Sequence, residues 1–425
     1  MPTIYQTVTI KSLQRAKQGA ITLYLPDGEA VICGEQTKDA PQIEFRIHNL
    51  DTFRQICLRK GIGLGESYQL GYWSSNNLTA LLEWFCVNLR ELSANITPTA
   101  SVALSTLAKV VDTIGHWKNR NTIEQSEKNI HAHYDLGNEF YNTFLDPSLT
   151  YSSAFFASEA QTLEEAQAEK YDRICRKLDL QPDHHLLEIG CGWGGFALHA
   201  AKRYGCKITG ITISKEQFAE ATRRVAEANM ESQISIEYAD YRTLEGKFDR
   251  IASIEMLEAV GEKFLDGYFT RVEELLAPNG LAAVQVITTP NPLYEKYRNS
   301  VDWIQKHIFP GSHLPSSRRL LKAAEIGQLD LLHQETFGLH YAKTLAQWRL
   351  RFLESWPQIE KQGFDKSFKH KWEFYLAYCE AGFRQRHINV MQMVFGRADE
   401  ESYDFEERTH TASRHNSTPA LVNAS

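Results

Sequence analysis

Residues 186–195 read L-L-E-I-G-C-G-W-G-G, an apolar strand that runs into a glycine-rich turn. A helical pattern follows from about Phe196, so the segment predicts a strand–turn–helix unit. Glycine removes the side chain where the backbone must turn sharply and touch a ligand, as at Gly190, Gly192 and Gly194. In doubly wound sheets the ligand lies at the carboxyl ends of the strands. The segment therefore indicates a ligand site, because three glycines and a strand-end acid are a costly arrangement for packing alone.

The residues after this turn alternate between apolar strand segments and helical patterns. With residues 186–189, the predicted strands are 207–211, 234–238, 250–254 and 281–286. Such alternation implies a parallel sheet with helices on both faces. The fold class is therefore predicted as α/β, with a doubly wound Rossmann-like sheet. After Thr289 we expect mostly helices rich in aromatic residues.

The N-terminal third has a different pattern, which predicts a smaller α+β domain. A short helical lead precedes strands over residues 19–48, and helical periodicity covers 50–60 and 78–92. The glycine-rich residues 61–73 between them predict a tight packed turn. The polar stretch 115–128 predicts a boundary. The expected division is a domain over 1–118, a catalytic domain over 119–397 and a disordered tail over 398–425.

Composition excludes several classes of protein. The 425 residues carry a net charge of −7, which gives no overall attraction to nucleic acid. The seven cysteines are scattered without metal-ligand spacing, so we expect reduced thiols, no metal and a cytoplasmic protein. The sequence has no apolar run of about 18 residues, the length that a membrane-spanning helix needs.

The strand ends predict a cofactor with an amino group and a nucleoside. Glu188 suits the methionine part of S-adenosylmethionine. Thr212 and Gln217 are candidates for the ribose hydroxyls, and the lack of an acid at that strand tip disfavours a nicotinamide cofactor. Asp240 and Tyr241 are candidates for the adenine, although Tyr241 also suits a packing role.

Several further motifs then resemble one family, the cyclopropane-fatty-acyl-phospholipid synthases and their mycolic-acid relatives. The resemblance covers residues 130–397 in the family's order, and G-L-G-E-S-Y-Q-L-G-Y-W (63–73) resembles the N-terminal domain of longer members. Besides the glycine turn, it rests on H-Y-D-L-G-N-E-F-Y (133–141), L-D-P-S-L-T-Y-S-S (145–153), G-I-T-I-S-K-E-Q (210–217), S-I-E-M-L-E-A-V-G (253–261), I-F-P-G-S-H-L-P-S (308–316), H-Y-A-K-T-L-A-Q-W (340–348) and F-R-Q-R-H-I-N-V-M-Q-M-V-F (383–395).

The resemblance implies a reaction on lipid. A cis double bond of a fatty acyl chain attacks the methyl group of S-adenosylmethionine, and the carbocation loses a proton from that methyl to bound bicarbonate as a cyclopropane closes. The resemblance also implies added helices over an acyl-chain site. Aromatic faces stabilise such a cation. The candidates, each of which also suits a core role, are Tyr134, Trp303, Phe309 and Tyr341.

Site residues carry over from the family by position. The cofactor contacts that it implies are Tyr151, Ser152, Glu188, Gly190, Gly192, Gly194, Thr212, Gln217, Asp240, Tyr241 and Ile254. The catalytic and bicarbonate-site residues that it implies are Glu258, Tyr341, Ser153, Gln285 and Ile287.

Three positions depart from the family pattern, all in the expected anion site. Ser153 stands where the family has cysteine, and Ala259 and Gln285 stand where it has histidine. Gln285 cannot take a charge, so the anion loses a cationic partner. Bicarbonate is therefore an open question, and a methylene or methyl-branched product is an alternative to the ring.

The expected partner is an unsaturated phospholipid, reached by peripheral association with the cytosolic membrane face, and a homodimer is a candidate assembly. Alternatives are a small-molecule methyltransferase of the same fold and a lipid carrier with a degenerate site. A basic group suits head groups or a solvated helix face: Arg318, Arg319 and Lys322. An apolar set suits either docking on lipid or core packing: Tyr72, Trp73, Leu78, Leu81, Leu82, Trp84 and Phe85.

Overall fold

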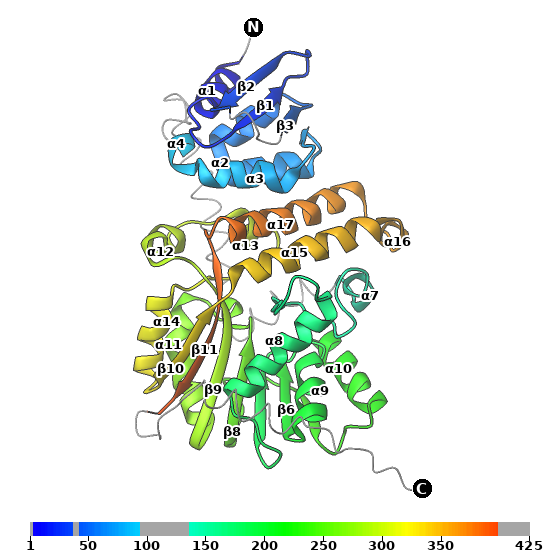
Figure 1. Cartoon of the computed structure of the whole chain (residues 1–425), viewed down its shortest axis with the longest axis vertical. Coiled ribbons are helices and arrows are strands. Elements are labelled where there is room, and N and C mark those ends of the chain that lie inside the picture. The colour runs from blue at the N-terminus through cyan, green and yellow to red at the C-terminus, as the bar shows by residue number, and fades with distance from the viewer. Residues whose placement is uncertain (1–2, 37–41, 94–135, 398–425) are drawn as a thin grey trace. The chain divides into compact units, whose positions relative to one another are not determined.

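The computed structural model describes residues 3–36, 42–93 and 136–397 (Figure 1). They form two compact units. The N-terminal unit comprises residues up to 146 together with 288–316 and 337–389, and the sheet unit comprises 147–287, 317–336 and the residues from 390. The predicted boundary at 118 and the predicted tail over 398–425 lie outside the described residues, so both stay predictions.

The sheet unit contains a seven-stranded sheet in the order β10-β11-β9-β8-β5-β6-β7. Parallel pairs join β5 to β6 and β8, β6 to β7, and β8 to β9, whereas β10 and β11 are antiparallel. The strands are β5 (His185–Ile189), β6 (Lys207–Thr212), β7 (Ile234–Tyr238), β8 (Phe248–Ile254), β9 (Leu276–Thr288), β10 (Asp330–Thr336) and β11 (Asn389–Gly396).

This topology confirms the five predicted strands and the α/β class. The expectation of mostly helices after residue 289 missed β10 and β11. All but the first residue of β11 are buried, so the strand shows no polar alternation that would distinguish it from a buried helix.

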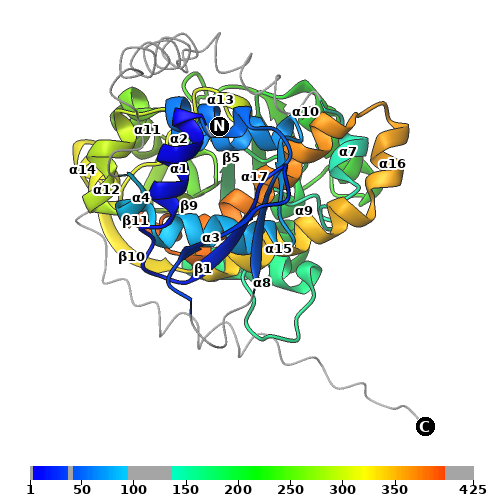
Figure 2. The ribbon, with the colours of Figure 1, turned by 90° about the horizontal axis from the view of Figure 1, so that it is seen from above.

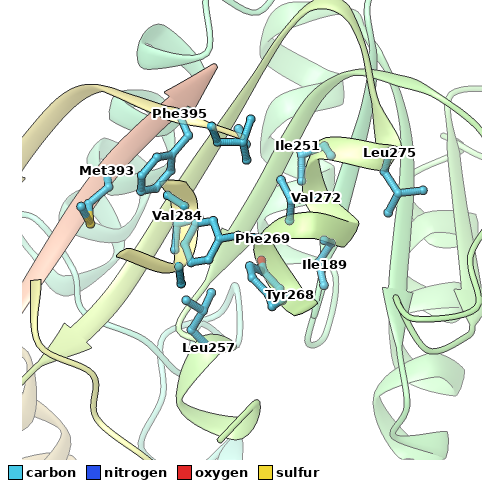
Figure 3. Close-up of a cluster of buried hydrophobic side chains, with 14 of the residues drawn as sticks. Ile189, Ile251, Leu257, Tyr268, Phe269, Val272, Leu275, Val284, Met393 and Phe395 are labelled. Carbon is cyan, nitrogen blue, oxygen red and sulfur yellow. The ribbon is translucent and has the colours of Figure 1, made fainter. Parts of the chain in front are cut away.

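Both faces of the sheet are covered, because alternate side chains of each strand enter different cores. On β5, Leu187 and Ile189 belong to a core that also contains residues of α11 (Leu265–Leu275) and α14 (Ser317–Ile326). Figure 3 shows Ile189 in this core together with Phe269 and Val272 of α11. The neighbouring Leu186 belongs to the second core. That core contains residues of α8 (Leu163–Lys177), α9 (Gly195–Tyr204) and α10 (Lys215–Glu227).

The N-terminal unit combines a four-stranded sheet, in the order β2-β1-β3-β4, with helices. Helices α15 and α17 run side by side, α17 also packs on α2 and α3, and α1 lies beside α2 (Figures 1 and 2). Its elements include α1 (Ile4–Leu13), β1 (Ala20–Tyr24), β2 (Ala30–Gly34), β3 (Ile43–Ile47), α2 (Asp51–Gln69), β4 (Trp73–Ser74), α3 (Leu78–Val87), α4 (Leu89–Ser93), α7 (Asn138–Tyr141), α12 (Asn291–Arg298), α13 (Trp303–His307), α15 (Gly338–Glu354), α16 (Trp356–Lys361) and α17 (Lys366–Arg384).

The predicted turn at residues 61–73 is wrong for most of its length, because α2 continues to Gln69 after a kink at Lys60 (φ 52°). Its glycines permit close packing instead of a turn. A Cβ atom at Gly65 would lie 2.5 Å from the ring of Trp303, which is fully buried. Most of the predicted apolar set is buried, which favours core packing over docking on lipid. The buried residues are Trp73, Leu78, Leu81, Leu82 and Trp84.

Candidate active site

The glycine turn follows β5, and its backbone conformation explains the three glycines. Gly190, Gly192 and Gly194 have φ angles of 80°, 53° and 80°, in the left-handed region that disfavours residues with a Cβ atom. A Cβ at Gly190 would also lie 2.8 Å from Met256, whereas a Cβ at Gly192 would meet nothing within 4 Å. The turn therefore exposes backbone to open space, where a ligand can approach closely.

Glu188 is the buried acid of this turn, and its Oε2 atom is buried with no hydrogen-bond partner. Burial raises the pKa of Glu188 well above the ordinary value, while the charge of Lys170 opposes that rise. The Lys170 ammonium donates a 2.7 Å hydrogen bond to the Ser152 hydroxyl. A buried carboxylate oxygen without a partner fits a ligand that carries an ammonium group, such as the methionine part of S-adenosylmethionine.

The candidate ribose pair is brought together at the end of β6. The Thr212 hydroxyl donates a 2.9 Å hydrogen bond to Gln217 Oε1, so the Gln217 amide turns its N–H groups elsewhere. Both side chains are buried, and Gln217 lies in the first turn of α10, which the Ser214 hydroxyl caps. The Gln217 amide donors therefore lie at the end of β6, the strand that pairs with β5 before the glycine turn. Donors in this place suit the ribose hydroxyls of a nucleoside.

The candidate adenine residues follow β7. Asp240 accepts two hydrogen bonds from the Arg242 guanidinium, at 2.8 Å and 2.6 Å. Tyr241 packs edge-on against Tyr268 with ring centroids 5.2 Å apart, which favours the packing role that was its alternative. Ile254 is the last residue of β8 and pairs in register with Gln285 of β9.

Glu255, which is not among the residues predicted from the sequence, contacts two residues of the predicted anion site, Ser153 and Gln285. It follows β8 directly and has a φ angle of 52°. Its Oε1 atom accepts a 2.8 Å hydrogen bond from the Ser153 backbone N–H and a 2.7 Å hydrogen bond from Gln285 Nε2. Its own backbone N–H donates to the Gln285 carbonyl at 2.7 Å. Nothing in the residue order marks this glutamate apart from its place directly after a parallel strand.

Glu258 lies three residues later, in the short 3-10 helix η2 (Leu257–Ala259). Its Oε1 atom accepts a 2.5 Å hydrogen bond from the Ile287 N–H, and its buried Oε2 atom has no partner. Burial, and then the charge of Glu255, raises the pKa of Glu258 to about 8. Glu258 therefore retains its proton at neutral pH.

A chain of buried side chains fixes the orientation of Gln285. Gln392 Nε2 donates to Gln285 Oε1 at 2.9 Å, and the Lys177 ammonium donates to Gln392 Oε1. Lys177 is fully buried and forms an ion pair with Glu335. Because a lysine ammonium only donates, each amide in turn must present its oxygen toward Lys177 and its N–H group away from it. Gln285 thus presents an N–H donor to Glu255.

Of the other predicted residues, several belong to the N-terminal unit. Tyr341 lies on α15, buried and stacked on Phe383 at 4.5 Å, and its catalytic role stays a prediction. Trp303 packs edge-on against Phe374 at 4.8 Å, which supports its core interpretation. Phe309 lies 6.0 Å from the ring of Tyr375. Tyr134 lies outside the described residues.

The predicted basic group does not act as one cationic patch. The Arg319 guanidinium pairs with Glu262 and Asp266, while Arg318 and Lys322 are exposed. Within residues 3–36, 42–93 and 136–397, no cluster of three or more histidine, cysteine, aspartate or glutamate side chains suits a metal ion. No helix in the same residues is long and apolar enough to cross a membrane.

The model of the mycolic acid cyclopropane synthetase family matches residues 121–393. The chain belongs to this family. A tuberculostearic acid methyltransferase of Mycobacterium tuberculosis is 37% identical over 88% of this chain and 86% of its own length. The cyclopropane-fatty-acyl-phospholipid synthase of Escherichia coli is 36% identical over 84% of this chain and 88% of its own length.

Solved structures agree with this assignment. A mycolic acid cyclopropane synthase crystallised with S-adenosylhomocysteine is 31% identical, with a TM-score of 0.60 over 63% of this chain and 97% of its own. The cyclopropane synthase MmaA2 of Mycobacterium tuberculosis is 30% identical, with a TM-score of 0.59. The family resemblance and the Rossmann-like fold are thus confirmed, and the chain is an S-adenosylmethionine-dependent methyltransferase of the cyclopropane synthase type.

Proposed function

We propose that the protein methylates the cis double bond of an unsaturated fatty acyl chain in a phospholipid and converts it to a cyclopropane. The observation that carries the proposal is the pair of half-buried acids at the carboxyl end of β8, Glu255 and Glu258. In parallel sheets, catalytic groups belong at this edge. A reaction that forms a carbocation needs a proton acceptor in a site that excludes water, and a carboxylate at this edge supplies one.

S-adenosylmethionine, when bound, supplies an electrophilic methyl group. The residues of this chain then have separable roles. Glu188 accepts from the ammonium group, while Thr212 and Gln217 bind the ribose hydroxyls. Ser153 and Gln285 hold Glu255 in place through their N–H groups, and the Ile287 N–H holds Glu258. Membrane association in this proposal is peripheral, at the cytosolic face, because an acyl chain must leave the bilayer locally to reach the two acids.

A methyl-branched or methylene product on the same lipid is the second candidate. It is favoured by the altered anion site, where Ser153, Ala259 and Gln285 depart from the family pattern. The similar identity to relatives that are named for different products gives neither candidate an advantage. Methylation of a small molecule stays a weaker alternative, since the likeness to coclaurine N-methyltransferase, at 19% identity, concerns the fold alone.

Isotope labelling separates these candidates. The purified protein is incubated with vesicles of monounsaturated phosphatidylethanolamine and with cofactor that carries a trideuterated methyl group, and fatty acid methyl esters are analysed by mass spectrometry. A saturated ring that retains two deuterium atoms supports the cyclopropane. Retention of all three deuterium atoms supports loss of a chain proton and a methyl-branched alkene, whereas two deuterium atoms on an exocyclic double bond support the methylene product. Full turnover on a short water-soluble alkene, with none on vesicles, would refute a phospholipid substrate.

A further inference from the structure

We propose that the carboxylate of Glu255 is the proton acceptor of this reaction, so that the protein works without bound bicarbonate. The inference rests on the proposed function and adds the identity of its base. It concerns a residue that follows β8 and contacts the predicted anion-site residues Ser153 and Gln285.

The first support is the convergence of donors on one atom. The Ser153 backbone N–H and the Gln285 amide both donate to Glu255 Oε1, at 2.8 Å and 2.7 Å. Two N–H donors aimed at one point form an anion site. Here a side chain of the protein itself provides the anion, and an external bicarbonate would have to displace it from both donors.

The second support is the direction of the donors, which Lys177 fixes. The ammonium of Lys177 donates to Gln392, Gln392 donates to Gln285, and Gln285 donates to Glu255. A buried cation thus orients two neutral amides so that the last one offers an N–H group. A donor in this position matches a charged carboxylate better than a protonated one.

The third support is the backbone at Glu255. Its φ angle of 52° lies in the left-handed region, which a residue with a Cβ atom rarely adopts. Glycine would occupy this position without strain. A glutamate that is kept in a disfavoured conformation, with its carboxylate held by two donors, indicates a role for the side chain.

Glu258 completes the charge arrangement. The raised pKa of Glu258 keeps this acid protonated at neutral pH, so Glu258 is not the charged proton acceptor. Glu255 accepts from the N–H groups of Ser153 and Gln285, whereas Glu258 accepts from the Ile287 N–H and from its own backbone N–H and leaves Oε2 without a partner. The negative charge is therefore best placed on Glu255, and Glu258 acts as a positioning residue.

The proposed step balances in atoms and electrons. The π electrons of the alkene form a bond to the methyl carbon as its bond to sulfur breaks, and S-adenosylhomocysteine leaves with that electron pair. One C–H bond of the new methyl then breaks, its electron pair closes the ring, and the proton passes to the Glu255 carboxylate. For a methyl-branched alkene the broken C–H bond lies on the acyl chain and its electron pair forms a chain double bond. For a methylene product a 1,2-hydride shift first moves the cation to the methyl-bearing carbon, and a C–H bond of the methyl then breaks to form the exocyclic double bond. The proton leaves to solvent when the product departs.

The test compares the full chain with Glu255→Gln and Glu255→Gly, in buffer freed of carbon dioxide and with added bicarbonate. The control is Glu245→Gln, an exposed acid of the same unit. Methylated acyl chains are quantified on monounsaturated vesicles, cofactor binding is measured by calorimetry, and binding of ¹³C-labelled bicarbonate to each protein is followed by NMR.

We expect the parent and the control to work equally with and without bicarbonate. Glu255→Gln should lose roughly 10²-fold or more in rate, the scale of general base catalysis, while it still binds the cofactor. Glu255→Gly should fold, bind bicarbonate and regain activity only when bicarbonate is added. Bicarbonate binding or bicarbonate dependence in the parent would overturn the inference, as would full activity of Glu255→Gln. If the parent binds cofactor but modifies no lipid, the proposed function fails, and bicarbonate binding by NMR still decides whether Glu255 occupies the anion site.

Discussion

Replacing Gln392 by glutamate should reverse the hydrogen bonds that hold Gln285 against Glu255. In the parent, Gln392 accepts from Lys177 and donates to Gln285 Oε1 at 2.9 Å. Glutamate has the same shape but no N–H group, so both of its oxygens accept. Gln285 must then turn its amide N–H toward residue 392 and its oxygen toward Glu255 Oε1, which now lies 2.7 Å from Nε2.

The size of the effect follows from the bond that is lost. A hydrogen bond to a charged group contributes about 1.5–3 kcal/mol. At about 1.4 kcal/mol per factor of ten, Gln392→Glu should lower kcat/KM on lipid vesicles roughly 10- to 100-fold. The fold should survive, because the new carboxylate pairs with Lys177, which is fully buried.

The assay measures kcat/KM on monounsaturated vesicles, cofactor affinity by calorimetry and the melting temperature. Gln334→Glu is the matched control, since it adds the same charge on the neighbouring strand β10 at an exposed position. Cofactor affinity should not change, because the glycine turn and Glu188 lie on β5 and the turn after it. Parent-like kcat/KM for Gln392→Glu, at an unchanged melting temperature, would refute the idea that this amide chain orients Gln285.

Three further changes test other parts of the structure. Gly65→Ala should destabilise the protein by about 1–3 kcal/mol by pushing into Trp303, whereas Gly61→Ala, in the same helix with open space around it, should stabilise it by ~0.5–1 kcal/mol; chemical denaturation measures both. The parent should lose stability as the pH rises from about 4.5 to 8, because in that range Glu258 keeps its proton in the folded state but loses it in the unfolded chain. Glu258→Gln should remove this pH dependence, which melting temperatures measured across the range check. Glu188→Gln should weaken cofactor binding roughly 10-fold or more yet raise the melting temperature of the ligand-free protein, and unchanged affinity in calorimetry would contradict the assigned role.

Much of the sheet unit was predictable because its signals are local. The five predicted strands match β5 to β9, since short apolar runs with intervening helical periodicity report burial directly. Local signals failed in β11, because an almost fully buried strand shows no alternation of apolar and polar residues. They also failed where glycine can indicate either a turn or close packing within a helix. In α2, Gly63 and Gly65 permit close packing inside a helix, although the same residues in sequence predict a turn.

In the candidate site, too, some residues were predictable from the sequence and one was not. The sequence placed Ser153, Gln285, Glu258 and Ile287 in one anion site through the family pattern, and the structure brings their contacts together around two acids. Glu255 was missed because its role depends on a left-handed backbone angle and on donors 102 and 30 residues away in sequence. Tyr341 belongs to the N-terminal unit, and its catalytic role stays a prediction.

By itself, the sequence determined the fold class and the glycine turn, because neighbouring residues encode both, and it indicated the family and the methyl donor through motifs that resemble those of known enzymes. Only the tertiary structure decided which way the Gln285 amide points and that Glu255 faces it. Those features arise from contacts among α8, β8, β9 and β11, elements separated by tens to hundreds of residues. A hydrogen-bond direction is set by the partner at the far end of a chain of side chains, here Lys177, and no local pattern in the sequence records it.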